Sequence, residues 1–145
     1  MKFKLINPAS GIDAEFTNRG IAKFLHTHLG EYRDDEENIL KAIEYVFQEN
    51  RGGLILLGLD GAELIGAVII NKTGMSGYIP ENILVYVAVH KDRRGSGVGK
   101  ELMKQVIRLS EGGIALHVEP DNPAVHLYKR LGFTSKYLEM RLPRP

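Results

Sequence analysis

The chain has 145 residues, which is enough for one domain with a single packed core. Its hydrophobic fraction of 43% and charged fraction of 26% are ordinary for a soluble globular protein, and 19 Lys and Arg against 18 Asp and Glu give a net charge of +1. This balance excludes a globally basic protein that binds nucleic acid or membranes, and the absence of cysteine excludes disulfides, cysteine metal ligands and a cysteine nucleophile.

The N-terminal residues 1–8 carry positive charge but no apolar run after it, so we expect no signal peptide. No apolar stretch approaches the length needed to cross a bilayer. We therefore expect a cytoplasmic protein with no membrane or nucleic-acid partner, and we expect no metal site.

The first third of the chain predicts one strand and a helical region. Residues 3–6 predict a short strand that ends at a proline. Residues 13–29 have a helical stripe of apolar residues, with Asp13 as candidate N-cap and Gly20 as a point where the stripe could divide into two helices. The acidic run 34–37 begins another helix, because negative charge suits a helix N-terminus, and we assign no functional site to this run.

The middle of the chain predicts a hairpin and a loop. Residues 54–59 and 63–70 predict two strands, and the Asp60-Gly61 pair between them is a strong hairpin signal. Residues 72–80 contain two glycines and a proline and predict a loop.

A strand, a basic glycine-rich turn and a helix follow in residues 84–109. Val85, Val87 and Val89 alternate as in a half-buried strand. The helical face begins at Val98 and continues through Leu102, Val106 and Leu109. Glycines allow close approach of a ligand to the backbone, and helix N-termini attract anions, so the join is a candidate phosphate site. An ordinary strand-to-helix connection with a basic surface is the alternative.

The last third predicts a strand over residues 114–118, a short helix over 124–131 and a final strand over 137–142. Asn122 is a good N-cap for the short helix, and Gly132 is a good stop. Strands that alternate with helices around a central hairpin favour an α/β fold, with a mixed sheet covered by helices in two or three layers. We expect one domain over residues 1–145.

Two phosphate-binding motifs do not fit the glycine-rich turn. A nucleoside-triphosphate loop would need glycine at Arg94 and a hydroxyl residue at Glu101. A dinucleotide fingerprint would need a third glycine at Lys100, and it would have to follow its strand directly.

The turn instead resembles the acyl-CoA site of the GNAT superfamily of N-acyltransferases. That signature is Arg or Gln, two residues, Gly, one residue, then Gly or Ala, and Arg94-Gly95-Ser96-Gly97-Val98-Gly99 matches every fixed position. A second family motif follows in order as Asn122, Ala124, Tyr128 and Gly132-Phe133. The resemblance covers residues 50–135 well, and it implies a mixed sheet of about six to seven strands with a splayed fourth and fifth strand pair holding the cofactor.

The resemblance also implies roles for particular residues. The main chain of Val87 and Val89 would bind the pantetheine arm of acetyl-CoA, and Asn122 would contact the same arm or act only as an N-cap. Tyr128 would be the general acid for the departing thiolate, or would only complete an apolar helix face. The pyrophosphate would be held mainly by the main-chain amides of Arg94, Gly95, Ser96, Gly97, Val98, Gly99 and Lys100.

The implied activity is transfer of an acetyl group from acetyl-CoA to a primary amine of a small molecule or protein. The strand carboxylate that many family members carry is missing, since Leu84, Val85 and Tyr86 occupy those positions. The general base is left open among Glu81, His117, Glu119 and water. A non-catalytic acyl-CoA-binding regulatory module is the alternative function. A homodimer that pairs through the last strands is also consistent with the resemblance.

Overall fold

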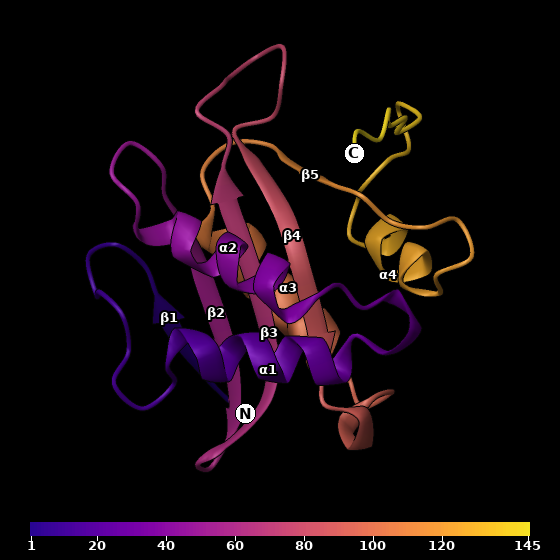
Figure 1. Ribbon diagram of the computed structural model, residues 1–145. Coiled ribbons are helices and arrows are strands. Elements are labelled where there is room, and N and C mark those ends of the chain that lie inside the picture. Colours follow the sequence, from indigo (N-terminus) through magenta and orange to yellow (C-terminus); the bar gives the residue numbers. More distant parts are fainter.

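Five strands form one mixed sheet in the computed structural model, which describes residues 1–145 (Figure 1). The strands lie in the order β1-β2-β3-β4-β5, so neighbours in space are neighbours in sequence. The first three pairs are antiparallel, whereas β4 and β5 are parallel. The bounds are β1 Lys2–Ile6, β2 Gly53–Asp60, β3 Glu63–Lys72, β4 Asn82–Val89 and β5 Ile114–Leu116.

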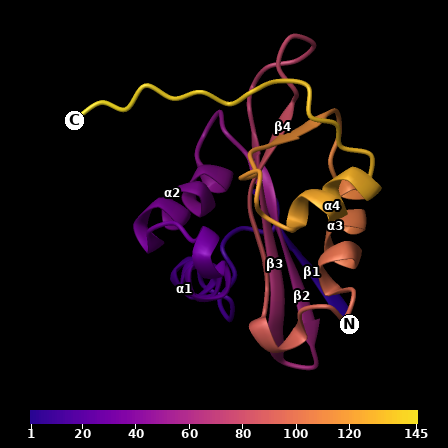
Figure 2. The same cartoon turned by 90° about the vertical axis from the view of Figure 1, so that its right-hand side faces the viewer.

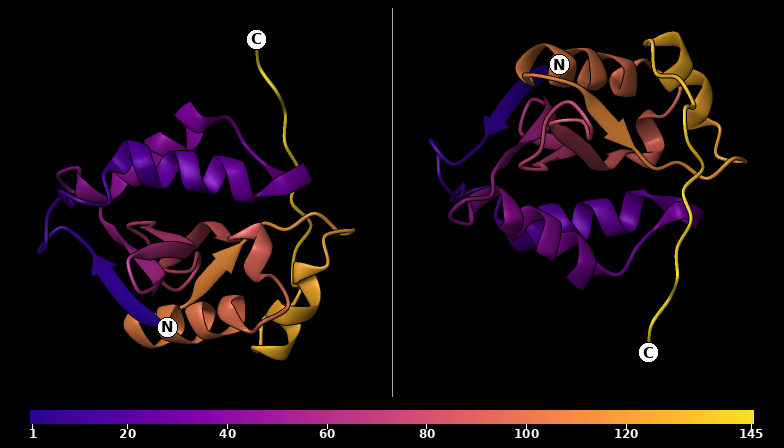
Figure 3. Two further views of the ribbon diagram at one scale, coloured as in Figure 1. Left: turned by 90° about the horizontal axis from the view of Figure 1, so that it is seen from below. Right: turned by 90° about the horizontal axis from the view of Figure 1, so that it is seen from above.

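Helices cover both faces of this sheet (Figures 2 and 3). On one face lie α1 (Asn18–His28) and α2 (Glu36–Phe47), and on the other lie α3 (Val98–Leu109) and α4 (Ala124–Arg130). Two short 3-10 helices, η1 (Gly30–Tyr32) and η2 (Lys91–Arg93), follow α1 and β4. The predicted α/β class is therefore confirmed, in its three-layer form. None of the helices combines the length and apolar character needed to cross a membrane.

Each face of the sheet has its own hydrophobic core, because alternate side chains of a strand point to opposite faces. Ile55 and Leu57 of β2 are fully buried on the side of α1 and α2. Leu54 and Leu56 pack instead with the apolar stripe of α3. The predicted hairpin between β2 and β3 forms at Gly61.

The first helix begins later than predicted. Its N-cap is Thr17, whose side chain accepts a hydrogen bond from the N–H of Gly20. The expected N-cap Asp13 accepts from the N–H groups of Glu15 and Phe16 instead, and so shapes the turn before the helix. Gly20 lies inside a single continuous helix. The helix predicted after the acidic run does begin there, at Glu36.

Two features of β4 leave an open edge in the sheet. The register with β3 shifts between Ile69 and Ile70, so that Val85 has no partner and forms a β-bulge. On its other side, β4 pairs with β5 only at residues 82–84. Beyond Leu84, β4 therefore continues to Val89 without a neighbour on the β5 side.

The predicted count of six to seven strands is wrong by at least one, because residues 137–142 form no strand. The segment 134–145 leaves the body of the protein in an extended course (Figures 2 and 3). Alternating apolar side chains show that a segment can form a strand, but a strand also needs a neighbouring edge to bond with, and here none pairs with it. The fifth strand is also shorter than predicted and ends at Leu116.

Candidate functional site

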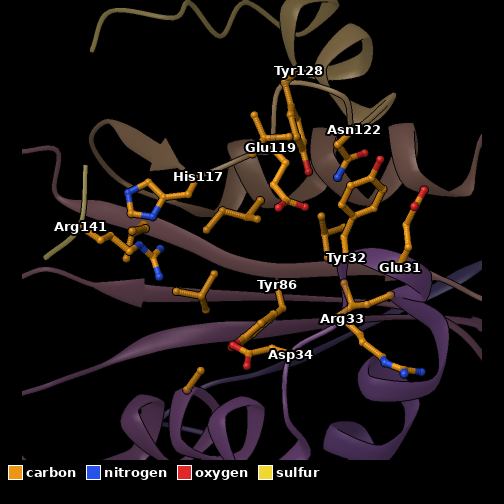
Figure 4. A pocket seen from close by; sticks show the side chains of 17 residues that line it. Glu31, Tyr32, Arg33, Asp34, Tyr86, His117, Glu119, Asn122, Tyr128 and Arg141 are labelled. Atoms are coloured by element: carbon orange, nitrogen blue, oxygen red, sulfur yellow. The ribbon is translucent and has the colours of Figure 1, made fainter. Parts of the chain in front are cut away.

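A cavity of about 580 Å³ lies where β4 and β5 separate (Figure 4). One wall is the bulged part of β4, and another is the chain that follows β5 together with α4. The segment between α1 and α2 contributes the remaining side. The polar or aromatic side chains that line it are Glu31, Tyr32, Arg33, Asp34, Tyr86, His117, Glu119, Asn122, Tyr128 and Arg141.

The open edge of β4 presents main-chain groups toward the β5 side. The N–H of His90 donates to the Ile65 carbonyl on β3 at 2.8 Å. Because main-chain groups alternate in direction along a strand, those of Val87 and Val89 point away from β3. The bulge at Val85 sets this alternation, since it shifts the register by one residue. Val87 also lines the cavity.

The glycine-rich turn presents a row of unpaired N–H groups. Gly95 and Gly97 have φ values of 78° and 88°, a left-handed backbone that glycine adopts without strain. The turn runs directly into α3, which begins at Val98. The N–H groups of residues 94–100 donate to no acceptor within the protein. This arrangement suits an anion, because helix N-termini carry partial positive charge.

Gly99 lies in the first turn of α3 and faces the open edge of β4. A Cβ atom added there would lie 3.5 Å from Cγ2 of Val89 and 3.8 Å from Cδ2 of Leu127. It would therefore project between the end of β4 and α4. The protein itself tolerates a methyl group at this position, because both distances are ordinary van der Waals contacts.

The basic side chains of the turn are mostly engaged by the protein itself. Arg93 forms ion pairs with Asp60 at 2.8 Å and Glu63 at 3.3 Å, at the β2–β3 hairpin. The guanidinium of Arg94 donates to the carbonyl of His28 at the end of α1. The Ser96 hydroxyl likewise donates to a main-chain carbonyl, that of Arg93. The main-chain amides and the exposed Lys100 are what the turn leaves free for an anion.

Asn122 accepts hydrogen bonds from the start of α4 and also lines the cavity. Its Oδ1 accepts from the N–H of Ala124 at 2.9 Å, and its carbonyl accepts from the N–H of Val125 at 3.1 Å. The side-chain hydrogen bond expected of Asn122 is therefore present, but α4 begins at Ala124, so that Pro123 and not Asn122 occupies the N-cap position. Since only Oδ1 is used, the Nδ2 amino group is left without a protein acceptor.

Tyr128 lies on α4 with its ring buried and its hydroxyl without a hydrogen-bond partner in the protein. The ring packs edge-on against Phe133, with centroids 5.8 Å apart. In Figure 4 the side chain projects into the cavity beside Glu119. Burial raises the pKa of the Tyr128 hydroxyl above its ordinary value, so that the phenol keeps its proton at neutral pH.

The three candidate bases lie in different places. His117 and Glu119 both line the cavity, whereas Glu81 does not. The Glu81 carboxylate accepts from the N–H of Gly113 at 2.9 Å, and this hydrogen bond lowers the pKa of the Glu81 carboxyl. Glu81 thus joins the start of β4 to the start of β5.

The model of the acetyltransferase (GNAT) family matches residues 24–133, which include the second half of α1, the open edge of β4, the glycine-rich turn and Tyr128. The chain belongs to the GNAT acetyltransferase family. No curated protein sequence is significantly similar to it.

Solved structures of GNAT acetyltransferases share this fold at low sequence identity. The aminoglycoside N-acetyltransferase AAC(6')-Iy in complex with CoA aligns with a TM-score of 0.69 and 15% identity, over 99% of this chain and 93% of that one. The ribosomal-protein-alanine N-acetyltransferase from Brucella melitensis biovar Abortus 2308 aligns with a TM-score of 0.65 and 17% identity, over 100% and 99%.

A protein that is not named as an acetyltransferase is equally similar in fold. A transcriptional regulator from Bacillus halodurans C-125 aligns with a TM-score of 0.70 and 16% identity, over 99% of this chain and 100% of that one. At such identities the likeness establishes the fold alone.

Sequence reasoning missed one pair of cavity residues in this GNAT chain. The hydroxyl of Tyr86 on β4 donates to Oδ2 of Asp34 at 2.6 Å. Asp34 belongs to the acidic run to which no site was assigned, and it precedes α2 by two residues. No local pattern marks this contact, because the two residues are 52 positions apart in the sequence.

Proposed function

We propose that this GNAT protein is an N-acetyltransferase that moves an acetyl group from acetyl-CoA to a primary amine of a small molecule or a protein. The observation that carries the proposal is one continuous path. It runs from the unpaired N–H groups of the glycine-rich turn, along the open edge of β4, to the cavity that holds the Tyr128 hydroxyl.

The residues present fit an acyl-CoA molecule along this path. The amides of Arg94, Gly95, Ser96, Gly97, Val98, Gly99 and Lys100 would hold the pyrophosphate, helped by the missing side chain at Gly99. The main-chain groups of Val87 and Val89 would bond to the amides of the pantetheine arm as an added strand does. The free Nδ2 of Asn122 would reach the same arm from the turn before α4.

Bound acetyl-CoA supplies an acetyl group activated as a thioester. As the amine nitrogen attacks, a C–N bond forms to the carbonyl carbon and the C–S bond breaks. Tyr128 gives its proton to the departing sulfur, whose thiol has a pKa of about 8.5. The new amide nitrogen loses its extra proton to the base or to water, and Tyr128 regains a proton from the solvent. The Tyr128 hydroxyl supports this role because it lines the cavity and donates to no acceptor within the protein.

The amine must lose a proton before it attacks, since an alkylammonium has a pKa of about 10.4. Glu119 and His117 lie in the cavity wall from which a base could act, directly or through a water molecule. The position of Glu81 outside the cavity favours these two residues over Glu81.

The test combines cofactor binding with turnover. Acetyl-CoA is expected to raise the unfolding midpoint of the protein, and a thiol-release assay over a panel of amines is expected to show CoA formation. The absence of cysteine keeps the background of that assay low. Tyr128→Phe should lower kcat about a hundredfold, the size of a lost general acid, while the shift of the midpoint by acetyl-CoA stays.

Tyr137→Phe is the matched control, because it removes the hydroxyl of an exposed tyrosine outside the cavity. Full turnover by Tyr128→Phe across the pH range would contradict the general-acid role. A midpoint shift with no CoA release from any amine would instead identify a non-catalytic acyl-CoA-binding module.

A further inference from the structure

The Asp34 carboxylate is held rigidly by three neutral donors. Its Oδ2 accepts from the Tyr86 hydroxyl at 2.6 Å. Its Oδ1 accepts from the N–H of Asp35 at 2.7 Å and from Nδ2 of Asn38 at 3.0 Å. These bonds fix the carboxylate in the cavity wall where η1 leads into α2. Each donor is neutral, so the negative charge itself is not compensated by them.

No ion pair in the protein includes Asp34. Burial on its own would raise the pKa of the Asp34 carboxyl, but its hydrogen bonds and the distant charge of Arg141 outweigh this effect and lower it. The group is therefore ionised at neutral pH. A partly buried charge without a cationic partner is unusual, because buried charges are normally paired.

Asp34 and Tyr128 lie on opposite sides of the cavity. Figure 4 shows Tyr128 and Glu119 projecting from one side, and Tyr86 and Asp34 from the other. An amine that reacts beside Tyr128 would thus extend its far end toward Asp34. That far end would meet an ionised carboxylate that makes no ion pair with the protein.

We propose that Asp34 selects acceptors that carry a second positive charge, so that linear diamines and similar compounds are preferred over monoamines. The inference rests on the proposed acetyltransferase function. The far ammonium group of the acceptor would bind the Asp34 carboxylate in a charge-assisted hydrogen bond, while the near amine reacts beside Tyr128. Tyr86 would act as a positioning residue that orients the carboxylate.

The two arginines that line the cavity, Arg33 and Arg141, offer a competing prediction. Arg141 lines the cavity from the C-terminal segment, and its side chain pairs with Glu139 and is 71% exposed. If this guanidinium determined specificity, an acceptor with a carboxylate at its far end would be preferred. Three test amines of the same chain length distinguish the two predictions.

The test measures kcat/KM for putrescine, n-butylamine and γ-aminobutyrate, which share a four-carbon chain and end in an ammonium, a methyl and a carboxylate group. The series is repeated at five and six carbons, so that chain length does not decide the result. The diamine is expected to be preferred over the monoamine about tenfold or more at the best length, the size of one hydrogen bond to a charged group. Asp34→Asn should reduce this preference to about one, through KM rather than kcat.

Two variants separate specificity from folding. Asp35→Asn removes the neighbouring carboxylate, which lies outside the cavity and makes no capping hydrogen bond, and the preference should stay as in the parent. Tyr86→Phe keeps the Asp34 charge but removes the hydrogen bond that orients it. The preference for the diamine should therefore weaken but remain above one, and this can be measured even if Asp34→Asn does not fold. Loss of the preference in Tyr86→Phe would overturn the proposal.

The remaining outcomes are also decisive. Equal kcat/KM for all three amines, a preference for γ-aminobutyrate, or a diamine preference that survives Asp34→Asn would each overturn the role of Asp34 while leaving the acetyltransferase function intact. Absence of CoA release from every amine would overturn the proposed function itself.

Discussion

At the scale of single residues, Gly97 and Gly99 are glycines for different reasons. Gly97 has a φ of 88°, which alanine adopts only with strain. Gly99 has ordinary helical geometry in the first turn of α3, and a Cβ there would make only ordinary contacts. The backbone of the protein therefore requires glycine at position 97, whereas at position 99 only a ligand that approaches closely would require it.

Alanine at the two positions should consequently have opposite effects. Gly97→Ala is expected to lower the free energy of unfolding by about 1 kcal/mol. Gly99→Ala is expected to leave it unchanged or raise it by up to ~1 kcal/mol, because alanine is favoured over glycine inside a helix. The same Gly99→Ala change should weaken acetyl-CoA binding about tenfold or more, equivalent to about 1.4 kcal/mol.

Chemical denaturation and calorimetric titration with acetyl-CoA measure these two quantities separately. A Gly99→Ala protein that binds acetyl-CoA as tightly as the parent would show that the cofactor does not pass over this residue.

At the scale of elements, His28 joins the end of α1 to the turn that precedes α3. Its ring lies between those of Phe24 and His90, with centroid distances of 4.6 Å and 4.2 Å. Its Nδ1 accepts from the N–H of Lys91 at 3.1 Å, and its carbonyl accepts from the Arg94 guanidinium. The end of α1, which leads into the cavity residues Leu29 and Glu31, is thereby connected to the proposed pyrophosphate site.

This connection should make stability depend on pH. Burial lowers the pKa of His28 below its ordinary 6.5, and the nearby basic groups His90, Arg94 and Lys91 lower it further against a smaller effect of Asp92. Below about pH 6.5 the unfolded chain therefore binds a proton at His28 that the folded protein does not bind. The contribution of neutral His28 to the free energy of unfolding is therefore complete above about pH 6.5 and decreases as the pH falls.

The unfolding midpoint is expected to decrease from pH 7 to pH 5, and less so in His28→Asn, whose amide oxygen can still accept from the Lys91 N–H. Thermal unfolding at a series of pH values measures both proteins. An identical pH dependence in the variant and the parent would show that His28 is not the group that titrates.

Element by element, the sequence predicts most of the scaffold because helices and hairpins depend on local patterns. The stripe of α3, the Asp-Gly hairpin and the turn before α3 are examples, and all three are present. The prediction of Asp13 as an N-cap was wrong because several polar residues near a helix start can each cap it, and Thr17 does so. The prediction of a final strand over residues 137–142 was wrong, because strand pairing depends on a partner edge that lies outside this segment.

The candidate site is less predictable, because its geometry depends on contacts between distant parts of the chain. The β-bulge at Val85 decides which main-chain groups face the open edge, and no residue type marks it. The pairing of Asp34 with Tyr86 joins a loop to a strand across 52 positions. The motif around the glycines could be located from the sequence, whereas the acceptor side of the cavity could not.

At the scale of the whole molecule, the segment 137–145 lies apart from both hydrophobic cores. Tyr137, Leu138, Met140 and Leu142 are all more than three-quarters exposed. Arg141 is the only residue of this segment that lines the cavity, and its positive charge contributes to the lowered pKa of Asp34. The segment should therefore influence the acceptor site electrostatically while contributing little to the stability of a single chain.

Removal of residues 137–145 is accordingly expected to change the free energy of unfolding by no more than about 0.5 kcal/mol, as surface changes do. The preference for a diamine over a monoamine should increase, because the positive charge of Arg141 no longer acts on Asp34. Arg141→Gln in the full chain is the matched control, since it should raise the preference in the same way without removing the apolar side chains. Two results together would contradict this view. The truncated protein would unfold at a clearly lower temperature than the full chain, and the unfolding midpoint would depend on protein concentration in the full chain but not in the truncated protein. These results would show that the segment packs against a second copy, as pairing through the last strands would require.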